Sequence, residues 1–452
     1  MKMNYKIKFY IPLIIAVAML LAVTLPVLGL PYCYSETQLL GDSIFFLKNS
    51  GIGLVFNHDT VELPDLFSLV FSLFARFVSC KPIVLHLFAM VFPALAIVAA
   101  YKFGKFFFSV QAGVIAASIM VVQNVFLAQS GLVLPIMMLN VCILGGLYFF
   151  FRERYGLCVV LMCAATLTDI IGLAASVYLL VAYFRIKYRE WTMNNSLLMA
   201  LPIALWLVYQ FVSLEVCGRF SIRHLDFSLQ NFVENAWFVF IAQHRWAMTA
   251  VLVAVLAVNI VNKNMLYFVK EMAWKGTAMF VLMFVTNSVM SPVQSWNLVP
   301  ISIFAVFTGC AISTLHTSYY SKYIVACAII AVSALGVTQR KSVSDAYVNY
   351  KSKVKVDKKT VELVVKKYDE NTCILCDKYF AKYLTNKNFG YVDGAMLYDC
   401  IPPSETTKIP QIAIYSSFAP DARLILLRDD VAYEKKHTIY IGEYEDEILQ
   451  KK

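Results

Sequence analysis

The chain has 452 residues, of which 60% are hydrophobic and only 15% are charged, and its formal net charge is +10. Because a soluble domain carries about 25% charged residues, this composition excludes an ordinary soluble protein and indicates that lipid surrounds most of the chain. Lys and Arg concentrate in the loops between apolar runs and in the tail. Membrane topology therefore explains the positive charge, and we expect no nucleic-acid partner.

About eleven apolar runs have a composition suited to transmembrane helices. They cover residues 9 to 30, 82 to 101, 109 to 128, 132 to 151, 156 to 169, 170 to 185, 196 to 214, 247 to 262, 274 to 290, 297 to 315 and 321 to 338. The first is long enough to span a bilayer, so we interpret it as an uncleaved helix rather than a signal peptide. The two runs on either side of Thr168 and Asp169 are short, which predicts a broken or partly sunken pair.

The basic loops set the orientation of the chain. With the N-terminus in the cytoplasm, the loops with Lys and Arg face inwards, as the positive-inside rule requires. Residues 31 to 81, residues 215 to 246 and the tail then lie outside. We expect a multi-pass protein of a bacterial inner membrane with an extracytoplasmic C-terminal domain.

The first outer segment and the tail have structure of their own. Residues 38 to 48 and 66 to 77 carry apolar side chains at helical spacing, which predicts helices that lie along the outer interface. From Arg340 the chain becomes polar, with the amphipathic stretch VKVDKKTVELVVKKYDE followed by the strand-like runs TCILC, QIAIYSS, RLILLRDD and HTIYIGEY. The prediction is an all-α polytopic membrane domain over residues 1–339 and a small soluble α/β or α+β domain over residues 340–452.

Three short motifs carry the functional signal. Ser35 and Glu36 open the first outer segment, the stretch from Glu62 to Phe67 follows about 25 residues later, and the stretch from Gln294 to Pro300 opens a late helix. This layout resembles the C-type (GT-C) polytopic glycosyltransferase superfamily, particularly its protein mannosyltransferase and lipid A aminoarabinose transferase branches. There, an Asp-Glu pair opens the first outer loop. Glu36 matches the second acid of that pair, and Ser35 takes the place of the Asp.

The resemblance implies a function. Such an enzyme moves a sugar from a polyprenyl-phosphate donor to a lipid, glycan or protein acceptor at the outer face of the membrane, among membrane lipids. Glu36 and Glu62 are the expected catalytic carboxylates, acting as a general base or beside a metal. The donor is already activated, and the sequence has no Walker A or dinucleotide fingerprint, so we expect no nucleotide cofactor. A divalent cation is left open.

The donor phosphate needs cations, and the basic residues expected on the outer side supply them. These candidates are Arg219, Arg223, His224 and Arg245. The alternative is that they extend towards lipid headgroups. Asp59 and Asp169 are additional candidates, with a loop turn and a helix cap as their respective alternatives.

Several residues depart from the superfamily pattern. Ser35 cannot act as a base without a neighbouring base of its own. The usual second acid is missing from the stretch Leu132 to Pro135, and the expected Leu-Thr-Lys-Gly segment reads Leu167 to Ile170 with Asp169 in place of the Lys. The alternative function is therefore a non-enzymatic or catalytically inactive membrane protein for lipid or polysaccharide transport or assembly.

Overall fold

The computed structural model divides the chain into two compact units. The first comprises Met1–Leu25, Ile52–Leu69 and Phe88–Val343, and the second comprises Pro26–Gly51, Val70–Leu87 and Ser344–Lys452. The structure describes residues 10–32, 36, 39–40, 65–79, 81–186, 192–218, 220–221, 228–243, 245–261, 277–290, 294–314, 334, 337, 340, 343, 351–369, 372–376, 380, 383–384, 399–401, 411–416, 433–441 and 444–451.

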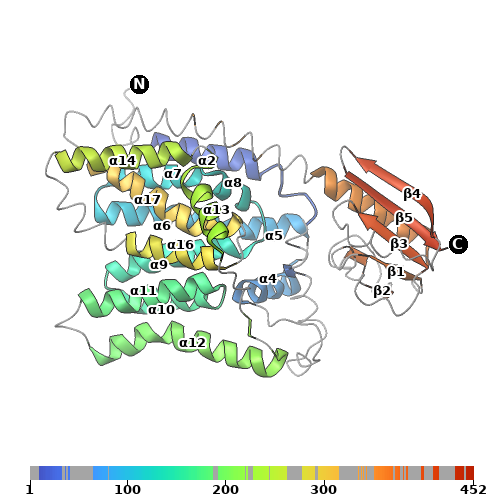
Figure 1. The fold of residues 1–452 in the computed structure, drawn as a ribbon, viewed down its shortest axis with the longest axis horizontal. Coiled ribbons are helices and arrows are strands. Elements are labelled where there is room, and N and C mark those ends of the chain that lie inside the picture. Colours follow the sequence, from blue (N-terminus) through green and yellow to red (C-terminus); the bar gives the residue numbers. More distant parts are fainter. Residues whose placement is uncertain are drawn as a thin grey trace. The chain divides into compact units, whose positions relative to one another are not determined.

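The membrane domain is built from apolar helices (Figure 1). They are α2 (Ile11–Thr24), α4 (Leu66–Phe77), α5 (Pro82–Ala89), α6 (Val91–Phe107), α7 (Val110–Val121), α8 (Asn124–Gln129), α9 (Pro135–Phe151), α10 (Tyr155–Thr166), α11 (Ile170–Ile186), α12 (Met193–Cys217), α13 (Leu229–Phe240), α14 (Arg245–Val261), α16 (Ala278–Val289), the 3-10 helix η2 (Gln294–Asn297) and α17 (Leu298–Thr314). Every apolar run expected from the sequence contains a described helix, except 321 to 338, most of which lies outside the described residues.

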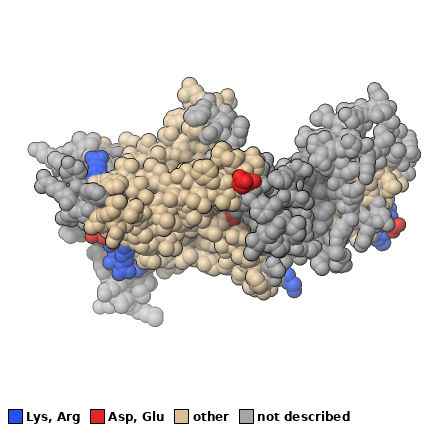
Figure 2. Space-filling view, turned by 90° about the horizontal axis from the view of Figure 1, so that it is seen from below, with Lys and Arg blue, Asp and Glu red and all other residues tan. Residues whose placement is uncertain are grey.

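Two described helices are long and apolar enough to cross a membrane, Pro82–Phe107 with 26 residues and Met193–Glu215 with 23. The bent pair Leu229–Phe240 and Arg245–Val255, whose halves meet at 77°, makes a third if it counts as one span. The other apolar helices have 10–17 residues. The long helix α12 exposes Leu, Val and Phe side chains outwards, and the described surface in Figure 2 carries few charged residues. Such a surface needs lipid, which confirms that this is a membrane protein.

Small residues let the central helices pack closely. A Cβ atom on Gly309 of α17 would lie 2.5 Å from the Cα of Ala116 on α7, so no larger residue fits there without a shift. The α6–α7 contact is similar, since a Cβ atom on Gly113 would lie 2.4 Å from the backbone oxygen of Tyr101. Close approach of backbones at small residues is typical of helix packing in membranes.

The short helices α10 and α11 lie side by side and form a hairpin with its turn at residues 167–169. A Cβ atom on Gly172 would lie 2.2 Å from the backbone of Ala165, so the helices touch directly beside the turn. The pair that we expected to be broken or sunken is therefore a tight hairpin. Asp169 lies in its turn, at the start of α11.

The second unit holds a mixed five-stranded sheet with the strand order β2-β1-β3-β5-β4. Its strands are β1 (Cys373–Leu375), β2 (Asp399–Ile401), β3 (Ile412–Ser416), β4 (Tyr433–Ile441) and β5 (Tyr444–Lys451). The first three pair in parallel, and β5 pairs antiparallel with β3 and β4. The expected amphipathic helix covers residues 351–367. Strands expected at TCILC, QIAIYSS and HTIYIGEY are present, whereas RLILLRDD lies outside the described residues.

Candidate functional site

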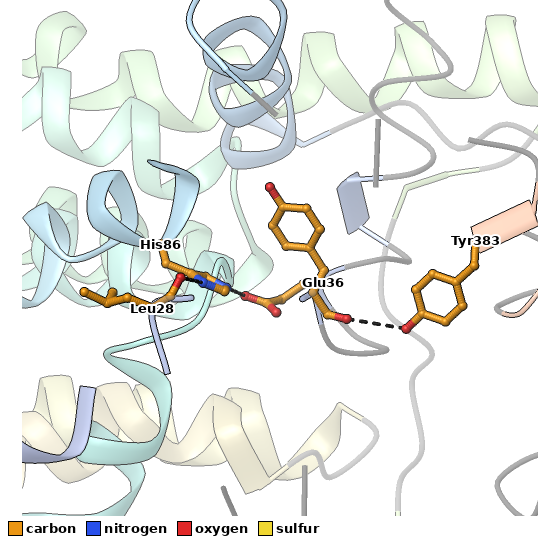
Figure 3. Close-up of polar contacts among 5 residues, drawn as sticks. Leu28, Glu36, His86 and Tyr383 are labelled. Atoms are coloured by element: carbon orange, nitrogen blue, oxygen red, sulfur yellow. Dashed lines mark hydrogen bonds and ion pairs between the residues drawn. The ribbon is translucent and has the colours of Figure 1, made fainter. Parts of the chain in front are cut away.

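Glu36 is fully buried and pairs with His86, a residue of α5 (Figure 3). The Nε2 atom of His86 lies 2.9 Å from Oε1 of Glu36, and its Nδ1 atom lies 3.0 Å from the backbone oxygen of Leu28. Both ring nitrogens are therefore engaged, which fixes the orientation of the imidazole. The carboxylate that the sequence proposed as a base lies in a polar contact inside the second unit.

The hydrogen bonds also determine how many protons this pair holds. A carbonyl oxygen only accepts, so Nδ1 of His86 must donate to Leu28. The contact between Nε2 and Glu36 then needs one more proton, on the ring or on the carboxyl. In both arrangements the net charge is zero, because either an imidazolium faces a carboxylate or both groups are neutral. A pair without net charge meets the condition under which ionisable groups are buried.

Two tyrosines extend this contact to the C-terminal domain. The ring of Tyr32 meets the His86 ring edge-on with centroids 5.7 Å apart. The hydroxyl of Tyr383 donates to the backbone oxygen of Tyr32 at 3.4 Å (Figure 3). Tyr32 and Tyr383 are both buried. The C-terminal domain thus holds the chain segment that leads directly to Glu36.

Arg245 is the first residue of α14, in the helical unit, and is only 2% exposed. Its Nε atom donates to the backbone oxygen of Phe238 at 2.7 Å, and Nη1 donates to Asn124 at 3.2 Å and to Gln243 at 3.0 Å. The guanidinium lies over the Phe238 ring, 4.3 Å from its centroid. Three helices, α8, α13 and α14, therefore fix this side chain in one place.

Among the described residues, the guanidinium of Arg245 has no compensating charge. Its Nη2 atom is buried and has no hydrogen-bond partner, and among the described residues no carboxylate forms an ion pair with it. An unpaired buried charge is expensive, so the arrangement suits an anion that arrives from outside the chain. The position adds to this, since the start of a helix favours negative charge. An arginine at such a place fits a phosphate group.

A backbone hydrogen bond between two aspartate helix caps joins the first outer segment to the α10–α11 hairpin. The Oδ1 atom of Asp65 accepts the backbone N–H of Ser68 at 2.6 Å and caps α4, and Asp169 accepts that of Ile171 at 2.9 Å and caps α11. The backbone N–H of Leu66 donates to Leu167 at 3.0 Å between these caps. The helix-cap alternative for Asp169 is therefore present in the structure.

The environment of Asp65 changes its acidity. Burial raises its pKa from 3.8 to about 6; the hydrogen bonds from Ser68 oppose the rise, and the negative charge of Asp169 adds to it. A carboxyl group that titrates close to neutral pH can accept a proton from a substrate under working conditions. Asp65 is thus a further candidate base in the outer segment.

Five of the residues proposed from the sequence, and Ser35, lie outside the described residues. The five are Glu62, Asp59, Arg219, Arg223 and His224. The part of the chain that the structure describes contains no group of three or more His, Cys, Asp or Glu side chains arranged for a metal ion. The described candidates, Glu36, Asp169 and Arg245, lie at three different contacts.

Sequence reasoning missed the partners of these residues. His86 carried a usable signal, because an ionisable side chain inside the apolar run PIVLHLFA is unusual in a membrane helix. Asp65 was part of the Glu62 to Phe67 motif, but its neighbour Asp169 is distant in sequence. Asn124, which orients Arg245, gave no signal, since only the tertiary packing of α8 brings it there.

The fold is similar to that of solved GT-C glycosyltransferases, as the resemblance in the sequence implied. The sequence matches no family profile, and no curated protein sequence is similar to it at a significant level. The similarity is therefore one of fold.

Two solved proteins illustrate the similarity. ArnT from Cupriavidus metallidurans, in its apo state, has a TM-score of 0.62 at 12% sequence identity, and the match covers 97% of each chain. ArnT is a lipid A aminoarabinose transferase. The archaeal oligosaccharyltransferase AglB from Archaeoglobus fulgidus, solved with an inhibitory peptide and a dolichol-phosphate, has a TM-score of 0.52 at 11% identity. That match covers 85% of this chain and 63% of AglB. Similarity at such low identity shows the fold.

Proposed function

We propose that this protein is a membrane glycosyltransferase that moves a sugar from a polyprenyl-phosphate donor to a lipid, glycan or protein acceptor at the outer face of a bacterial inner membrane. The observation that carries the proposal is the buried guanidinium of Arg245, which has an unpaired Nη2 atom and no carboxylate partner among the described residues. The GT-C fold supports it, because one of the similar structures, AglB, holds a dolichol-phosphate.

The reaction needs two kinds of group. A hydroxyl or amine of the acceptor attacks the anomeric carbon of the sugar, the bond from that carbon to the phosphate oxygen breaks, and polyprenyl phosphate leaves. Arg245 stabilises the negative charge that develops on the phosphate as this bond breaks. Arg219, Arg223 and His224 are proposed to assist it from the same outer segment. A divalent cation beside the phosphate is left open.

The proton of the acceptor passes to a base. Glu36 and Glu62 are the bases proposed from the sequence, and Oε1 of Glu36 is engaged by His86. Asp65, with a pKa of about 6, is a third candidate base, and its Oδ1 atom accepts the backbone N–H of Ser68. Glu36→Gln, Glu62→Gln and Asp65→Asn separate the three, since only loss of the true base removes turnover while donor binding persists.

The test is transfer of a labelled sugar from a polyprenyl-phosphate donor by purified protein in lipid. Arg245→Met should lower kcat/KM by about 100-fold, because a charged hydrogen bond to phosphate contributes about 3 kcal/mol. Arg245→Lys keeps the charge but not the planar fork and should retain part of the activity. Equal activity of wild type and Arg245→Met would remove the proposed role of Arg245.

A catalytically inactive relative, used for transport or assembly of lipids or polysaccharides, is the second candidate. The observation that favours it is the closed contact between Glu36 and His86, which leaves Glu36 fully buried. In that case the protein binds polyprenyl phosphate through Arg245 and transfers no sugar from any donor. Binding without turnover distinguishes this candidate from the enzyme.

A further inference from the structure

Three buried asparagines form a chain of hydrogen bonds in the helical unit. Asn287 of α16 donates to Asn297 of η2 at 2.7 Å, and Asn297 donates to Asn235 of α13 at 2.9 Å. Asn287 and Asn297 are fully buried, and Asn235 is 3% exposed. We call these three residues the amide relay. Asn297 belongs to the stretch from Gln294 to Pro300 that the sequence analysis singled out.

Both ends of the amide relay lack a partner. The Nδ2 atom of Asn235 and the Oδ1 atom of Asn287 are buried and form no hydrogen bond with any residue that the structure describes. If all three amide groups were turned over, the donor end and the acceptor end would change places, but one of each would still be open. A buried polar atom without a partner is destabilising, so the two ends of the relay leave one donor and one acceptor open to a further group.

The amide relay lies close to Arg245 along the chain and in space. Asn235 lies one helical turn before Phe238, whose backbone oxygen and ring both contact the guanidinium of Arg245. The 3-10 helix η2, which carries Asn297, contacts both α13 and α8, and α8 supplies Asn124 to Arg245. The charged group and the relay therefore belong to one polar region.

An aromatic pair borders the amide relay on the same two helices. Phe232 and Phe284 lie one turn before Asn235 and Asn287 respectively, and their ring centroids are 5.1 Å apart. Phe232 is 40% exposed, so its ring is accessible. Aromatic side chains with a few fixed polar groups are typical of sites for small molecules.

We infer that the amide relay binds hydroxyl groups of the donor sugar while Arg245 holds the phosphate, an inference that rests on the proposed function. A hydroxyl both donates and accepts, so it satisfies either end of the relay in either orientation of the amides. An anion would satisfy only the donor end, and a cation only the acceptor end. The relay residues are themselves uncharged, so the ligand part that fits them is a neutral polyhydroxylated group.

Binding of two probes tests this assignment. One is polyprenyl phosphate without a sugar. The other is polyprenyl phosphate that carries a hexose or a pentose, whichever of the two forms wild type binds more tightly. In wild type the sugar should raise affinity. Asn235→Leu and Asn287→Leu should each weaken the sugar-loaded probe by about tenfold and leave polyprenyl phosphate unchanged, since each removes about one hydrogen bond to a buried ligand group. Arg245→Met should weaken both probes.

Asn140→Leu is the matched control, because Asn140 is fully buried on α9 with neither amide atom hydrogen-bonded. It should change the binding of neither probe. Unchanged binding of polyprenyl phosphate shows that a variant is folded. The sugar assignment is overturned if the sugar adds no affinity in wild type. It is also overturned if the relay variants weaken the binding of both probes equally, or weaken the binding of neither probe, which is the result expected when water fills the relay. If wild type binds no polyprenyl phosphate, the proposed function fails and the assignment fails with it.

Discussion

Two buried ionisable contacts in the described part of this protein, Glu36–His86 and Arg245, differ in whether the charge is compensated. In the second unit, Glu36 and His86 hold one proton between them and have no net charge. In the helical unit, the guanidinium of Arg245 donates three hydrogen bonds and lies over one aromatic ring, but it pairs with no carboxylate among the described residues. The first contact is complete without a ligand, and the second is complete only with an anion.

This difference assigns them separate roles. A compensated pair stabilises the position of the chain around it, whereas an uncompensated charge is held at a cost in stability that function must justify. An apolar replacement should therefore have opposite effects on thermal stability at the two contacts. It should lower the stability at the Glu36–His86 pair, and it should leave the stability equal or higher at Arg245. The predictions below use that contrast.

The largest effect on stability is expected at the Glu36–His86 pair. His86→Leu and Glu36→Leu each leave one buried ionisable group without its partner, which should lower the free energy of unfolding by about 3–5 kcal/mol. The measurement is the thermal midpoint of the purified protein in detergent at neutral pH.

The double variant serves as the control for this prediction. Replacing both members of a buried pair with apolar side chains is often close to neutral, so Glu36→Leu with His86→Leu should be more stable than either single variant. Additive losses in the double variant would show that packing, rather than the shared proton, holds the pair.

The next effect concerns Asp65, whose charge is only partly accommodated. Because its folded pKa is raised from 3.8 to about 6, the stability linked to its protonated form is fully present below pH 4 and is lost as pH rises through about 6. The loss should be about 1–3 kcal/mol. In Asp65→Asn, which keeps a helix-capping side chain, this decline between pH 4 and 6 should disappear. A decline of the same size in both proteins assigns it to other groups.

An effect of similar size is expected from packing without charge. Gly309→Ala places a Cβ atom 2.5 Å from the backbone of Ala116 and should lower stability by about 1–3 kcal/mol. Gly156→Ala is the matched control, since Gly156 has no atom within 4 Å of its added Cβ. It should be neutral or slightly stabilising because alanine favours the helix. Thermal midpoints that fall equally in both variants would contradict the close α7–α17 contact.

Much of the fold could be predicted from the sequence, because apolar runs and loop charges are local signals. The ranges of the apolar helices, the helix at 66–77 and most strands of the C-terminal domain followed from periodicity and composition. The tight α10–α11 hairpin could not be predicted in detail, since the close contact of Gly172 with Ala165 depends on tertiary packing.

Less of the site could be predicted, because pairing is not local. Glu36 was identified from the resemblance and Arg245 as a basic residue on the expected outer side, but their partners His86 and Asn124 lie 50 and 121 residues away in the chain. Whether a buried charge is compensated depends on such distant partners. The property that separates the two contacts therefore became visible only in three dimensions.

The most direct test of the central claim is the thermal midpoint of wild type and Arg245→Met, each with and without polyprenyl phosphate. The account predicts that wild type is stabilised by the ligand, as any ligand that binds only the folded state must do. Arg245→Met should begin at an equal or higher midpoint, since it removes an uncompensated buried charge, and should gain much less from the ligand than wild type does. A variant that is less stable than wild type and gains as much from polyprenyl phosphate would contradict the account.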